Sequence, residues 1–236
     1  MKNFLSFLTA LAVFSIATAR ADTLADWTFE TTYALITGSS TALSGLAADS
    51  GSGTASGLHA STATWSSPAG NGSPHSFSVN TWTVGDYFQF SVSTLGFQDI
   101  TLSFDQASSN TGPQNYGLFY SVNGGSYTQF GANYSVLANA SPNPVWNTTT
   151  YQAVYTFSID LSSVTALDNA ATVVFRLVDM STTSANGGTV ATAGTDRVDN
   201  FTVSATPVPE PSTLALGLVG GFSCLVALRR KRQLFC

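Results

Sequence analysis

The sequence predicts an all-β protein, an antiparallel β-sandwich of the jelly-roll kind, and two observations lead to that fold class. Apolar and polar residues alternate at a spacing of two in several segments, and clusters of Gly, Asn and Pro separate these segments. No window of about a dozen residues keeps the 3.6-residue apolar spacing of an amphipathic helix. Strands of this kind bury one face against a second sheet, so two packed antiparallel sheets are expected.

The first half of the chain begins this series of strands. We expect a strand at 26–33, a loop of small residues at 37–57, a strand at 58–65 and a turn-rich connection at 66–74. Clearer strands follow at 86–92 and 99–106. In the latter, Ile100, Leu102 and Phe104 alternate with polar residues and therefore share one face.

The second half contains the most definite local prediction, a hairpin. Strands at 116–122 and 127–130 flank Asn123-Gly-Gly-Ser126, whose Asn and Gly tolerate the positive φ of a tight turn. The last three strands are expected at 151–160, 171–179 and 194–205. The run within 171–179 is almost continuously apolar, which predicts a central strand with both faces covered. About nine strands in total suit a sandwich.

The first 21 residues have the pattern of a secretory signal peptide. Lys2 supplies a positive start, residues 4–17 an apolar stretch, and Ala19-Arg20-Ala21 a small-x-small cleavage site. The alternative, a first transmembrane helix, fits poorly because the apolar stretch is short and polar sequence follows at once. The exported domain is therefore expected to be 22–206, one domain by size.

The tail, 207–236, combines three features in a fixed order. A Pro-Glu-Pro triplet (Pro209, Glu210, Pro211) precedes an uncharged apolar run at 212–228, and a basic cluster follows it, made of Arg229, Arg230, Lys231 and Arg232. The apolar run would form a single transmembrane helix of about 25 Å, at the short limit for crossing a bilayer. The basic cluster would hold its end on the cytoplasmic side.

This order of features resembles the PEP-CTERM sorting signal of exported proteins of Gram-negative bacteria. The resemblance covers about 25 residues at the end of the chain. It implies recognition by a membrane protease-transferase of the exosortase type, transient anchoring in the inner membrane, removal of the helix, and delivery to the cell surface, outer membrane or extracellular matrix. The alternative is a plain C-terminal membrane anchor that is never cleaved.

Charge is distributed unevenly along the chain. The formal net charge of the whole chain is −5, but residues 22–206 hold 12 acidic residues against two cations, Arg176 and Arg197, a formal charge of −10. Such a domain repels nucleic acid and anionic lipid, so neither is expected as a partner, whereas divalent cations and neutral polymers stay compatible. Both cysteines, Cys224 and Cys236, lie in the tail, so packing, hydrogen bonds or a metal must stabilise the domain.

A second resemblance spans most of the exported domain. It is carried by Trp27-Thr-Phe-Glu30, Ser103-Phe-Asp-Gln106, Tyr116-Gly-Leu-Phe-Tyr-Ser-Val-Asn-Gly-Gly125 and Asp196-Arg-Val-Asp-Asn-Phe-Thr-Val203. These segments are similar to bacterial jelly-roll modules of the carbohydrate-binding, galactose-binding-like kind. The resemblance implies that a Glu of the first strand and an Asp of the last, here Glu30 and Asp199, share a structural Ca²⁺ with loop carbonyls.

Strand alternation tests that implication. It places Asp199 on one face with Arg197, Phe201 and Val203, and a carboxylate in a core-facing row is costly unless it is paired or bound to a metal. Glu30 alternates differently and would reach a rim site only where the strand ends or bulges. The alternatives are an ion pair of Asp199 with Arg176 or Arg197, or surface acids without partners.

Two tryptophans are candidates for contact with a carbohydrate ligand, because flat aromatic rings cover the apolar faces of sugar rings. Trp82 and Trp146 stand among Asn, Thr and Pro, as expected for loop positions. Trp and Tyr are also standard residues of the core and rim of a sandwich, so structural packing is the alternative for both tryptophans.

The sequence contains little that indicates catalysis. His59 and His75 have no carboxylate at a useful spacing in the chain, and no nucleophile elbow, zinc-binding helix motif or phosphate-binding loop is present. We therefore expect a non-enzymatic structural or adhesive protein associated with biofilm or exopolysaccharide. The alternatives are a carbohydrate-binding module with structural calcium and, less favoured, a secreted hydrolase that uses acids such as Asp99, Asp105, Asp160 or Asp179.

Overall fold

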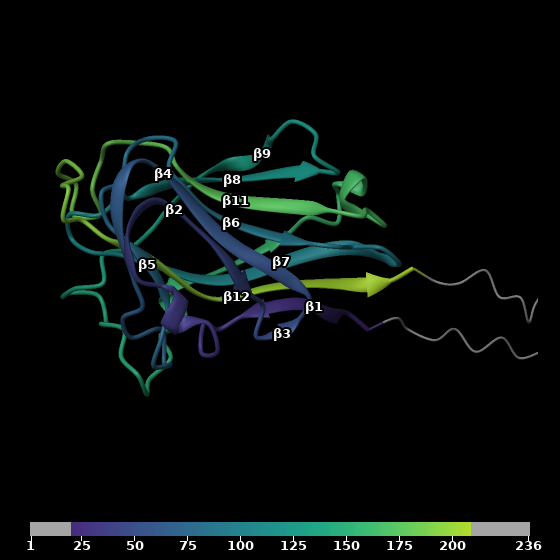
Figure 1. Cartoon of the computed structure of the whole chain (residues 1–236), viewed down its shortest axis with the longest axis horizontal. Coiled ribbons are helices and arrows are strands. Elements are labelled where there is room, and N and C mark those ends of the chain that lie inside the picture. The colour runs from purple at the N-terminus through teal and green to yellow at the C-terminus, as the bar shows by residue number, and fades with distance from the viewer. Residues whose placement is uncertain (1–19, 209–236) are drawn as a thin grey trace, which may run out of the picture.

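The computed structural model describes residues 20–208, and these form a sandwich of two antiparallel β-layers (Figure 1). The predicted all-β antiparallel sandwich is confirmed. The predicted signal peptide (1–21) and the PEP-CTERM tail (207–236) lie almost wholly outside the described residues. Between residues 20 and 208, no helix is long and apolar enough to cross a membrane.

Each layer is a hydrogen-bonded series of antiparallel strands. The first layer runs in the order β2 (Gly38–Ala47), β4 (Gly53–Ser66), β6 (Tyr87–Val92), β11 (Val173–Asp179), β8 (Asn115–Val122) and β9 (Thr128–Ser135). The second runs β3 (Ser50–Gly51), β1 (Asp22–Trp27), β12 (Asp196–Pro207), β7 (Phe97–Ser108) and β10 (Thr156–Asp160). Strand β5 (Phe77–Val79) pairs with both β4 and β12 and so joins the two layers.

Three short 3-10 helices complete the described secondary structure: η1 (Tyr33–Leu35), η2 (Ala153–Tyr155) and η3 (Thr165–Leu167). Strands β1 and β12 lie side by side, with Asp22 opposite Ala205. The two ends of the described chain therefore lie at the same end of the sandwich (Figure 1).

The core between the layers is rich in aromatic rings. Phe90 of β6 stacks on Phe201 of β12 with ring centroids 3.5 Å apart, and Trp27 of β1 meets the edges of both rings at 5.3 and 5.9 Å. All three side chains are fully buried. Because each ring comes from a different strand and both layers contribute, this cluster ties the sandwich together.

Seven predicted strands are confirmed, five of them within about two residues at both ends, while β4 begins five residues before the predicted strand at 58–65 and β9 ends five residues after the one at 127–130. The seven are the strands expected at 58–65, 86–92, 99–106, 116–122, 127–130, 171–179 and 194–205. The hairpin at Asn123 is also confirmed, with positive φ at Asn123 (49°) and Gly124 (76°). The strand expected at 151–160 begins only at Thr156, because η2 precedes it.

The predicted loop at 37–57 is wrong, because this segment contains β2, β3 and the start of β4. Strand β2 pairs with β4 along its length but lies at the edge of the layer, and most of its residues are exposed on both sides. A strand without a buried face has no alternation of polar and apolar residues, so its small side chains look like a loop.

The predicted strand at 26–33 ends early, at Trp27. The Asp49 carboxylate accepts hydrogen bonds from the backbone N–H groups of Thr28 (2.9 Å), Phe29 (2.8 Å) and Thr31 (2.9 Å). Phe29 has a φ of 60°, which turns the chain out of the sheet. These hydrogen bonds lower the pKa of Asp49 against the opposing effect of its burial, the largest single influence. A side chain 20 residues away thus ends the strand.

Candidate functional site

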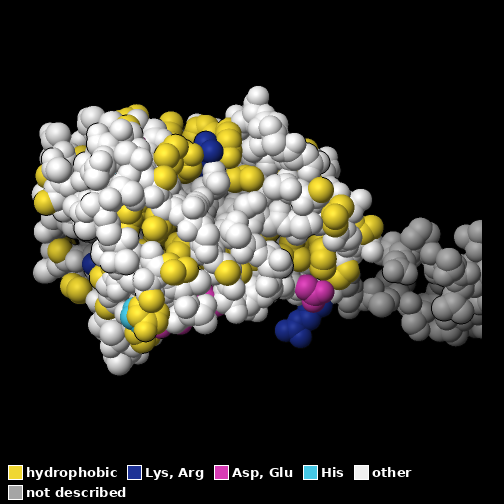
Figure 2. Space-filling model, viewed as in Figure 1, with side chains coloured by type: hydrophobic (Ala, Val, Ile, Leu, Met, Phe, Trp, Pro, Cys, Tyr) yellow, Lys and Arg dark blue, Asp and Glu magenta, His cyan; other side chains and the backbone are white. Residues whose placement is uncertain are grey.

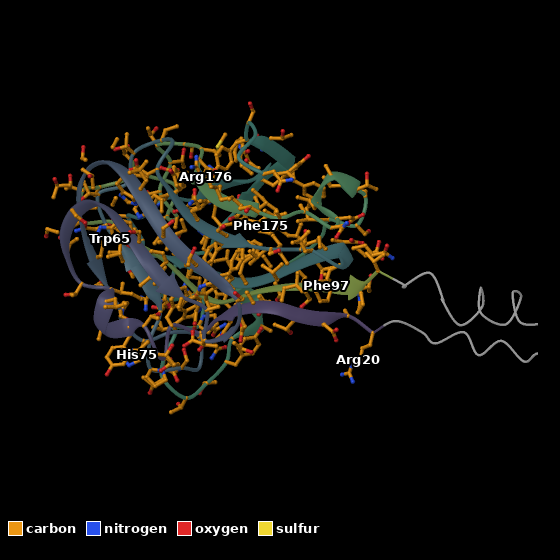
Figure 3. All side chains as sticks on the ribbon, turned by 45° about the vertical axis from the view of Figure 1, so that its right-hand side comes forward. Arg20, Trp65, His75, Phe97, Phe175 and Arg176 are labelled. Carbon is orange, nitrogen blue, oxygen red and sulfur yellow. The ribbon has the colours of Figure 1, made fainter. Side chains whose placement is uncertain are left out.

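The central strand β11 was predicted to be covered on both faces, and this prediction is wrong. Along β11 buried and half-buried residues alternate. Phe175 and Leu177 are fully buried in the core, while Arg176 lies on the outer side of the layer (Figure 3). The outward-facing side chains of β11 are half-buried and partly apolar, and an apolar stretch on a polar surface often marks an interaction site. We therefore take this outer side as the candidate site.

Strand register aligns a continuous row of side chains across this outer side. Arg176 lies opposite Gln89 of β6 and opposite Phe119 of β8; Gln89 in turn lies opposite Ser56 of β4, and Phe119 opposite Gln129 of β9. We call this row and the rows on either side of it the Arg176 face. The neighbouring rows are Thr54–Ser91–Val174 and Leu58–Tyr87–Val178.

Arg176 is held rigidly at the centre of this face. Its guanidinium carbon lies 3.8 Å from the centre of the Tyr87 ring and 3.6 Å from that of Tyr127, so two aromatic rings contact one cation. Arg176 Nε donates to Gln89 Oε1 (2.8 Å), and the Tyr127 hydroxyl donates to the same oxygen (3.2 Å). Gln89 Nε2 donates to Ser56 Oγ (3.2 Å). These hydrogen bonds link Arg176, Tyr127, Gln89 and Ser56, so each side chain restricts the orientation of the next.

The Arg176 face contains a cation and no acidic residue. In Figure 2 one basic side chain lies within a ring of hydrophobic ones over this layer, while acidic side chains are visible in the lower part of the view. The acids closest to the face in sequence, Asp86 and Asp179, are buried. Among residues 20–208, no carboxylate forms an ion pair with Arg176. Its charge is balanced by ring faces and amide oxygen alone.

Two shallow hollows lie at the ends of the β4–β6 pair, one on each side of the Arg176 row. One, of about 270 Å³, is lined by residues 52–54, 91–93 and 171–172. The other, also of about 270 Å³, is lined by residues 58–60 and 84–86. The face is therefore recessed at both ends, with the arginine between them.

The outer side of the second layer is covered where Asp105 and Asp199 lie, whereas its other part, around residues 101–103, 158–160 and 204, is open and forms a hollow of about 290 Å³. Asp105 of β7 and Asp199 of β12 lie opposite each other and are almost inaccessible to solvent. Asp199 Oδ2 accepts hydrogen bonds from Asn71 N (2.8 Å) and Ser73 Oγ (2.8 Å), and Asp105 Oδ2 accepts one from Asn200 Nδ2 (2.8 Å). Burial, aided by Asp105, raises the pKa of Asp199 to about 7 against these hydrogen bonds.

A bulge explains why the predicted facing of Asp199 is wrong. The β12–β7 register shifts between Asp199 and Thr202, and Asn200 has a φ of 50°. Phe201 and Val203 consequently point into the core, whereas Asp199 stays on the outer side with Arg197. The carboxylate is buried because the loop at 69–73 covers it.

The predicted ion pairs of Asp199 do not form within the described residues. Arg176 lies on the other layer, and Arg197 Nη1 donates to the carbonyl oxygen of Ala69 (2.8 Å). Glu30, the second predicted calcium ligand, borders the same loop: its Oε1 accepts from His75 N (2.9 Å). The structure thus brings Glu30 and Asp199 to one loop, and Ser73 and His75 lie between them.

Both predicted ligand-contacting tryptophans lie in loops, yet both are buried. Trp82 is 7% exposed, packs against His59 and Tyr116, and donates from Nε1 to the Val79 carbonyl oxygen. Trp146 is 3% exposed and packs on Tyr155. These contacts match the alternative of structural packing.

A further buried acid, Asp196, lies inside the sandwich. Asp196 Oδ1 accepts from Gln106 Nε2 (2.9 Å), and its Oδ2 lies 2.6 Å from Ser108 Oγ, which is also 2.5 Å from the Pro113 carbonyl oxygen. The Ser108 hydroxyl faces both acceptors, Asp196 Oδ2 and the Pro113 carbonyl oxygen. Burial raises the pKa of Asp196 well above its usual value, against the hydrogen bonds from Ser108 and Gln106.

The histidines have carboxylate neighbours in space that the sequence spacing does not reveal. His59 Nδ1 lies 3.4 Å from Asp86 Oδ2, and His75 Nε2 lies 4.0 Å from Glu30 Oε2. His59 is buried between Trp65 and Trp82, and its burial lowers its pKa. His59 Nδ1 also faces the Thr81 carbonyl oxygen (3.2 Å), which fixes the proton on Nδ1. No hydroxyl or thiol in the described part bonds to the other nitrogen.

Sequence reasoning missed Arg176, Tyr87, Tyr127 and Gln89 as a group. Arg176 was considered only as a partner for Asp199. Its position as the one cation in an apolar strand was an available signal, but the neighbouring residues come from strands whose pairing the sequence does not fix.

No protein-family model matches the chain, and no curated protein matches it. Among solved structures, the chain is 12% identical to the carbohydrate-binding module TmCBM27, described as recognising mannan, over 79% of this chain and 99% of that one, with a TM-score of 0.39. It is 17% identical to CtCBM11 over 84% of this chain and 100% of that one, with a TM-score of 0.37.

A third similar structure is a cleaved adhesin domain of Lys-gingipain from Porphyromonas gingivalis. It is 16% identical over 59% of this chain and 78% of that one, with a TM-score of 0.36. At these identities and TM-scores the similarities say nothing about a ligand or an activity of this chain.

Proposed function

We propose that this chain is an exported, non-enzymatic adhesive protein of the cell surface or extracellular matrix, and that its sandwich binds polysaccharide on the Arg176 face. The observation that carries the proposal is the solvent-facing guanidinium clamped between Tyr87 and Tyr127. Such a cluster has fixed donors beside flat rings, the combination that a sugar with hydroxyl groups and an apolar ring face requires.

Preorganisation supports this assignment. A free arginine loses considerable rotamer freedom when it binds a ligand, whereas Arg176 is already held by two rings and one hydrogen bond. Tyr127 is 37% exposed, so part of its ring is open to a ligand. The cluster therefore offers contact area at a small entropic cost.

The test is binding of the full chain to a panel of polysaccharides, with Arg176→Ala and Tyr127→Ala as site variants. Tyr33→Ala is the matched control, because Tyr33 is similarly exposed and stacks on His75, with ring centroids 3.8 Å apart, away from the Arg176 face. We expect both site variants to lose binding and the control to keep it. Absence of binding to any polysaccharide would instead favour a purely structural role.

Export and sorting are the second part of the proposal. The signal peptide would direct the chain through the inner membrane, and the tail at Pro209–Pro211 with its basic cluster would direct an exosortase-type enzyme to remove the helix. Cell fractionation and intact-mass analysis of the secreted form test this. A full-length chain that stays in the cytoplasm or inner membrane with its tail intact would contradict it.

We also propose structural calcium at the loop that Glu30 and Asp199 border. Asp199 Oδ2, Ser73 Oγ and the His75 carbonyl oxygen converge beside Gly70, where an added Cβ would lie 2.2 Å from each. These are hard oxygens of the kind Ca²⁺ takes. Residues 20–208 contain no group of three or more His, Cys, Asp or Glu that could hold a metal, so carbonyl oxygens would have to complete the set.

Thermal unfolding of the full chain with EDTA and with added Ca²⁺ tests the metal. A bound Ca²⁺ would neutralise the negative charge of the Glu30 and Asp199 carboxylates and would stabilise the folded state. We therefore expect the melting temperature to rise with Ca²⁺ and to fall with the chelator. A melting temperature that responds to neither removes Glu30 and Asp199 as ligands.

A hydrolytic activity is the remaining alternative. Of the acids that could serve it, Asp105 and Asp179 are buried, while Asp99 and Asp160 are exposed. Turnover of any bound polysaccharide that Asp99→Asn or Asp160→Asn abolishes would establish it and would overturn the non-enzymatic assignment.

A further inference from the structure

We infer that the ligand of the Arg176 face is an acidic polysaccharide, and that the carboxylate of a uronic acid unit pairs with the Arg176 guanidinium. This inference rests on the proposed polysaccharide binding and adds the charge of the sugar. It is carried by the hydrogen-bonding state of Arg176, by the placement of acids in the domain and by the extent of the face.

Arg176 has unused hydrogen-bonding capacity. Its Nε donates to Gln89, and within the described residues neither of its terminal nitrogens donates to a protein atom. Arg197, by contrast, uses Nη1 on a carbonyl oxygen. The two terminal nitrogens of a guanidinium present a planar fork that matches the two oxygens of a carboxylate. The protein supplies many carboxylates but directs none of the described ones to Arg176.

The formal charge of the domain opposes binding of an anionic polymer, but most of its acidic residues lie away from this face. The two nearest, Asp86, which lines the hollow at 58–60, and Asp179, at the end of β11, are buried. None of the residues in the Arg176 row or the two flanking rows is acidic. Asp26, Asp99, Asp105, Asp160 and Asp199 belong to the strands of the other layer. At physiological salt, charges more than about 8 Å away are strongly screened.

The dimensions of the face suit a polymer. The hollow at 52–54 and the hollow at 58–60 lie on the same strand, with Ser56 and its partner Gln89 between them. From Thr54 to Ala60 the strand extends about 20 Å at ~3.3 Å per residue, enough for several sugar units. A chain laid along β4 and β6 would pass Arg176 midway, with Tyr87 beside it.

Two other occupants are compatible with a cationic, aromatic surface. A neutral polysaccharide could use the same rings and donors through its hydroxyl groups. A second copy of this chain could present an acid of its other layer to Arg176 and so form a head-to-tail assembly. Both are distinguished from a uronate ligand by the measurements below.

The experiment compares binding of the full chain to polygalacturonate, to alginate and to carboxyl-reduced forms of the same polymers, at low and high ionic strength. Reduction keeps the sugar ring and linkage but removes the charge. We expect reduction to weaken binding about tenfold or more, the size expected for loss of a hydrogen bond to a charged group. High salt should weaken binding to the acidic form and leave any residual binding to the reduced form unchanged.

Three variants locate the effect. Arg176→Gln removes the charge and should reduce the preference for the acidic form to about that of the reduced polymer. Arg176→Lys keeps the charge without the fork and should give intermediate affinity. Tyr33→Ala should bind as the unmodified chain does. Melting temperatures confirm that each variant is folded, and size-exclusion chromatography reports self-association.

Each other outcome has a definite meaning. Equal binding of acidic and reduced polymers overturns the uronate inference and leaves the proposed function in place. Binding to no polymer overturns both. Acid-selective binding that survives Arg176→Gln overturns the assignment to this face. Self-association that Arg176→Gln abolishes, without polymer binding, identifies a second copy as the occupant and contradicts the inference.

Discussion

The outer sides of the two layers place an arginine beside an aromatic ring in very different surroundings. Arg176 lies between Tyr87 and Tyr127 on a face with no described segment above it. Arg197 lies 5.6 Å from the centre of the Trp146 ring and donates to the carbonyl oxygen of Ala69 in the loop that covers β7 and β12. Both sites place an arginine against an aromatic ring, and they differ in whether a loop covers the arginine and accepts its hydrogen bonds.

Cover determines which hydrogen-bonding groups are already used. Beneath the loop, Asp199 receives N–H and O–H donors from Asn71, Ser73 and Asn200, and Arg197 has a carbonyl acceptor. On the open side, Arg176 keeps its terminal nitrogens free of described protein acceptors. Under the loop these groups already have protein partners, whereas on the open side the terminal nitrogens of Arg176 remain available for the proposed ligand.

The largest expected effect comes from the buried ring beside Arg197. Trp146→Ala should lower the free energy of unfolding by about 3–5 kcal/mol, because it deletes a buried ring that packs on Tyr155. Tyr127→Ala, on the open side, should cost about 1 kcal/mol or less. Urea unfolding of both variants measures the difference. Similar losses for the two would mean that the open face is also structural.

A pH effect should follow from the covered acids. The folded-state pKa of Asp199, about 7, exceeds the unfolded value near 3.8, so its protonated form is favoured by folding. The resulting stability is complete below about pH 4 and is lost as the pH rises through 7, by a few kcal/mol in total. Asp179, with a pKa of about 6, acts in the same direction.

Unfolding free energies at about pH 5 and pH 8 measure this trend, in EDTA so that no bound Ca²⁺ keeps Asp199 ionised. The chain should be less stable at the higher pH, the reverse of a protein stabilised by ionised salt bridges. Asp160→Asn is the control, since the exposed Asp160 has a lowered pKa through its hydrogen bonds to Ser162. A stability that rises between these pH values would contradict the assignment of Asp199 as a buried, protonated acid.

A smaller effect is expected from filling the space beside Asp199. In Gly70→Ala the new methyl group would lie 2.2 Å from Asp199 Oδ2 and from the His75 carbonyl oxygen, so the loop must move. We expect a loss of about 1–3 kcal/mol. Gly188→Ala is the matched control, because its Cβ would meet its nearest atom at 3.3 Å. Equal stabilities of the two variants would show that the loop is loosely held.

The smallest effect is expected from Tyr127→Phe. The change removes the hydroxyl that donates to Gln89 but keeps the ring on Arg176. Stability should change by about 0.5 kcal/mol or less, and polysaccharide binding should stay close to that of the unmodified chain. A large loss of binding would show that Gln89 needs the tyrosine hydroxyl to position Arg176.

The sequence predicted the covered parts of the fold better than the open ones. Strands with one buried face, such as β7 with Ile100, Leu102 and Phe104, carry the alternation that identifies them. Strand β2 has hardly any buried face, so nothing in its sequence marked it. The bulge at Asn200 was equally invisible, because a single residue in the positive-φ region reverses the facing of every residue after it.

The candidate site could not be predicted for a related reason. Arg176, Gln89, Ser56 and Tyr127 come from separate parts of the chain and meet only through strand pairing. The predicted calcium ligands Glu30 and Asp199 do border one loop. Glu30 follows the first strand and Asp199 lies in the last, and these two strands pair with each other.

The position of β12 determines how the sandwich would carry a mechanical load. This strand ends at Pro207 and is hydrogen-bonded on one side to β1 and on the other to β7. A pull at Val208 acts along the axis of β12, so the bonds of both ladders would be sheared together instead of opening one after another. A ligand held on the opposite layer would pass its tension into the sandwich along this strand. The fold is therefore expected to resist a pull applied at this end of the described chain.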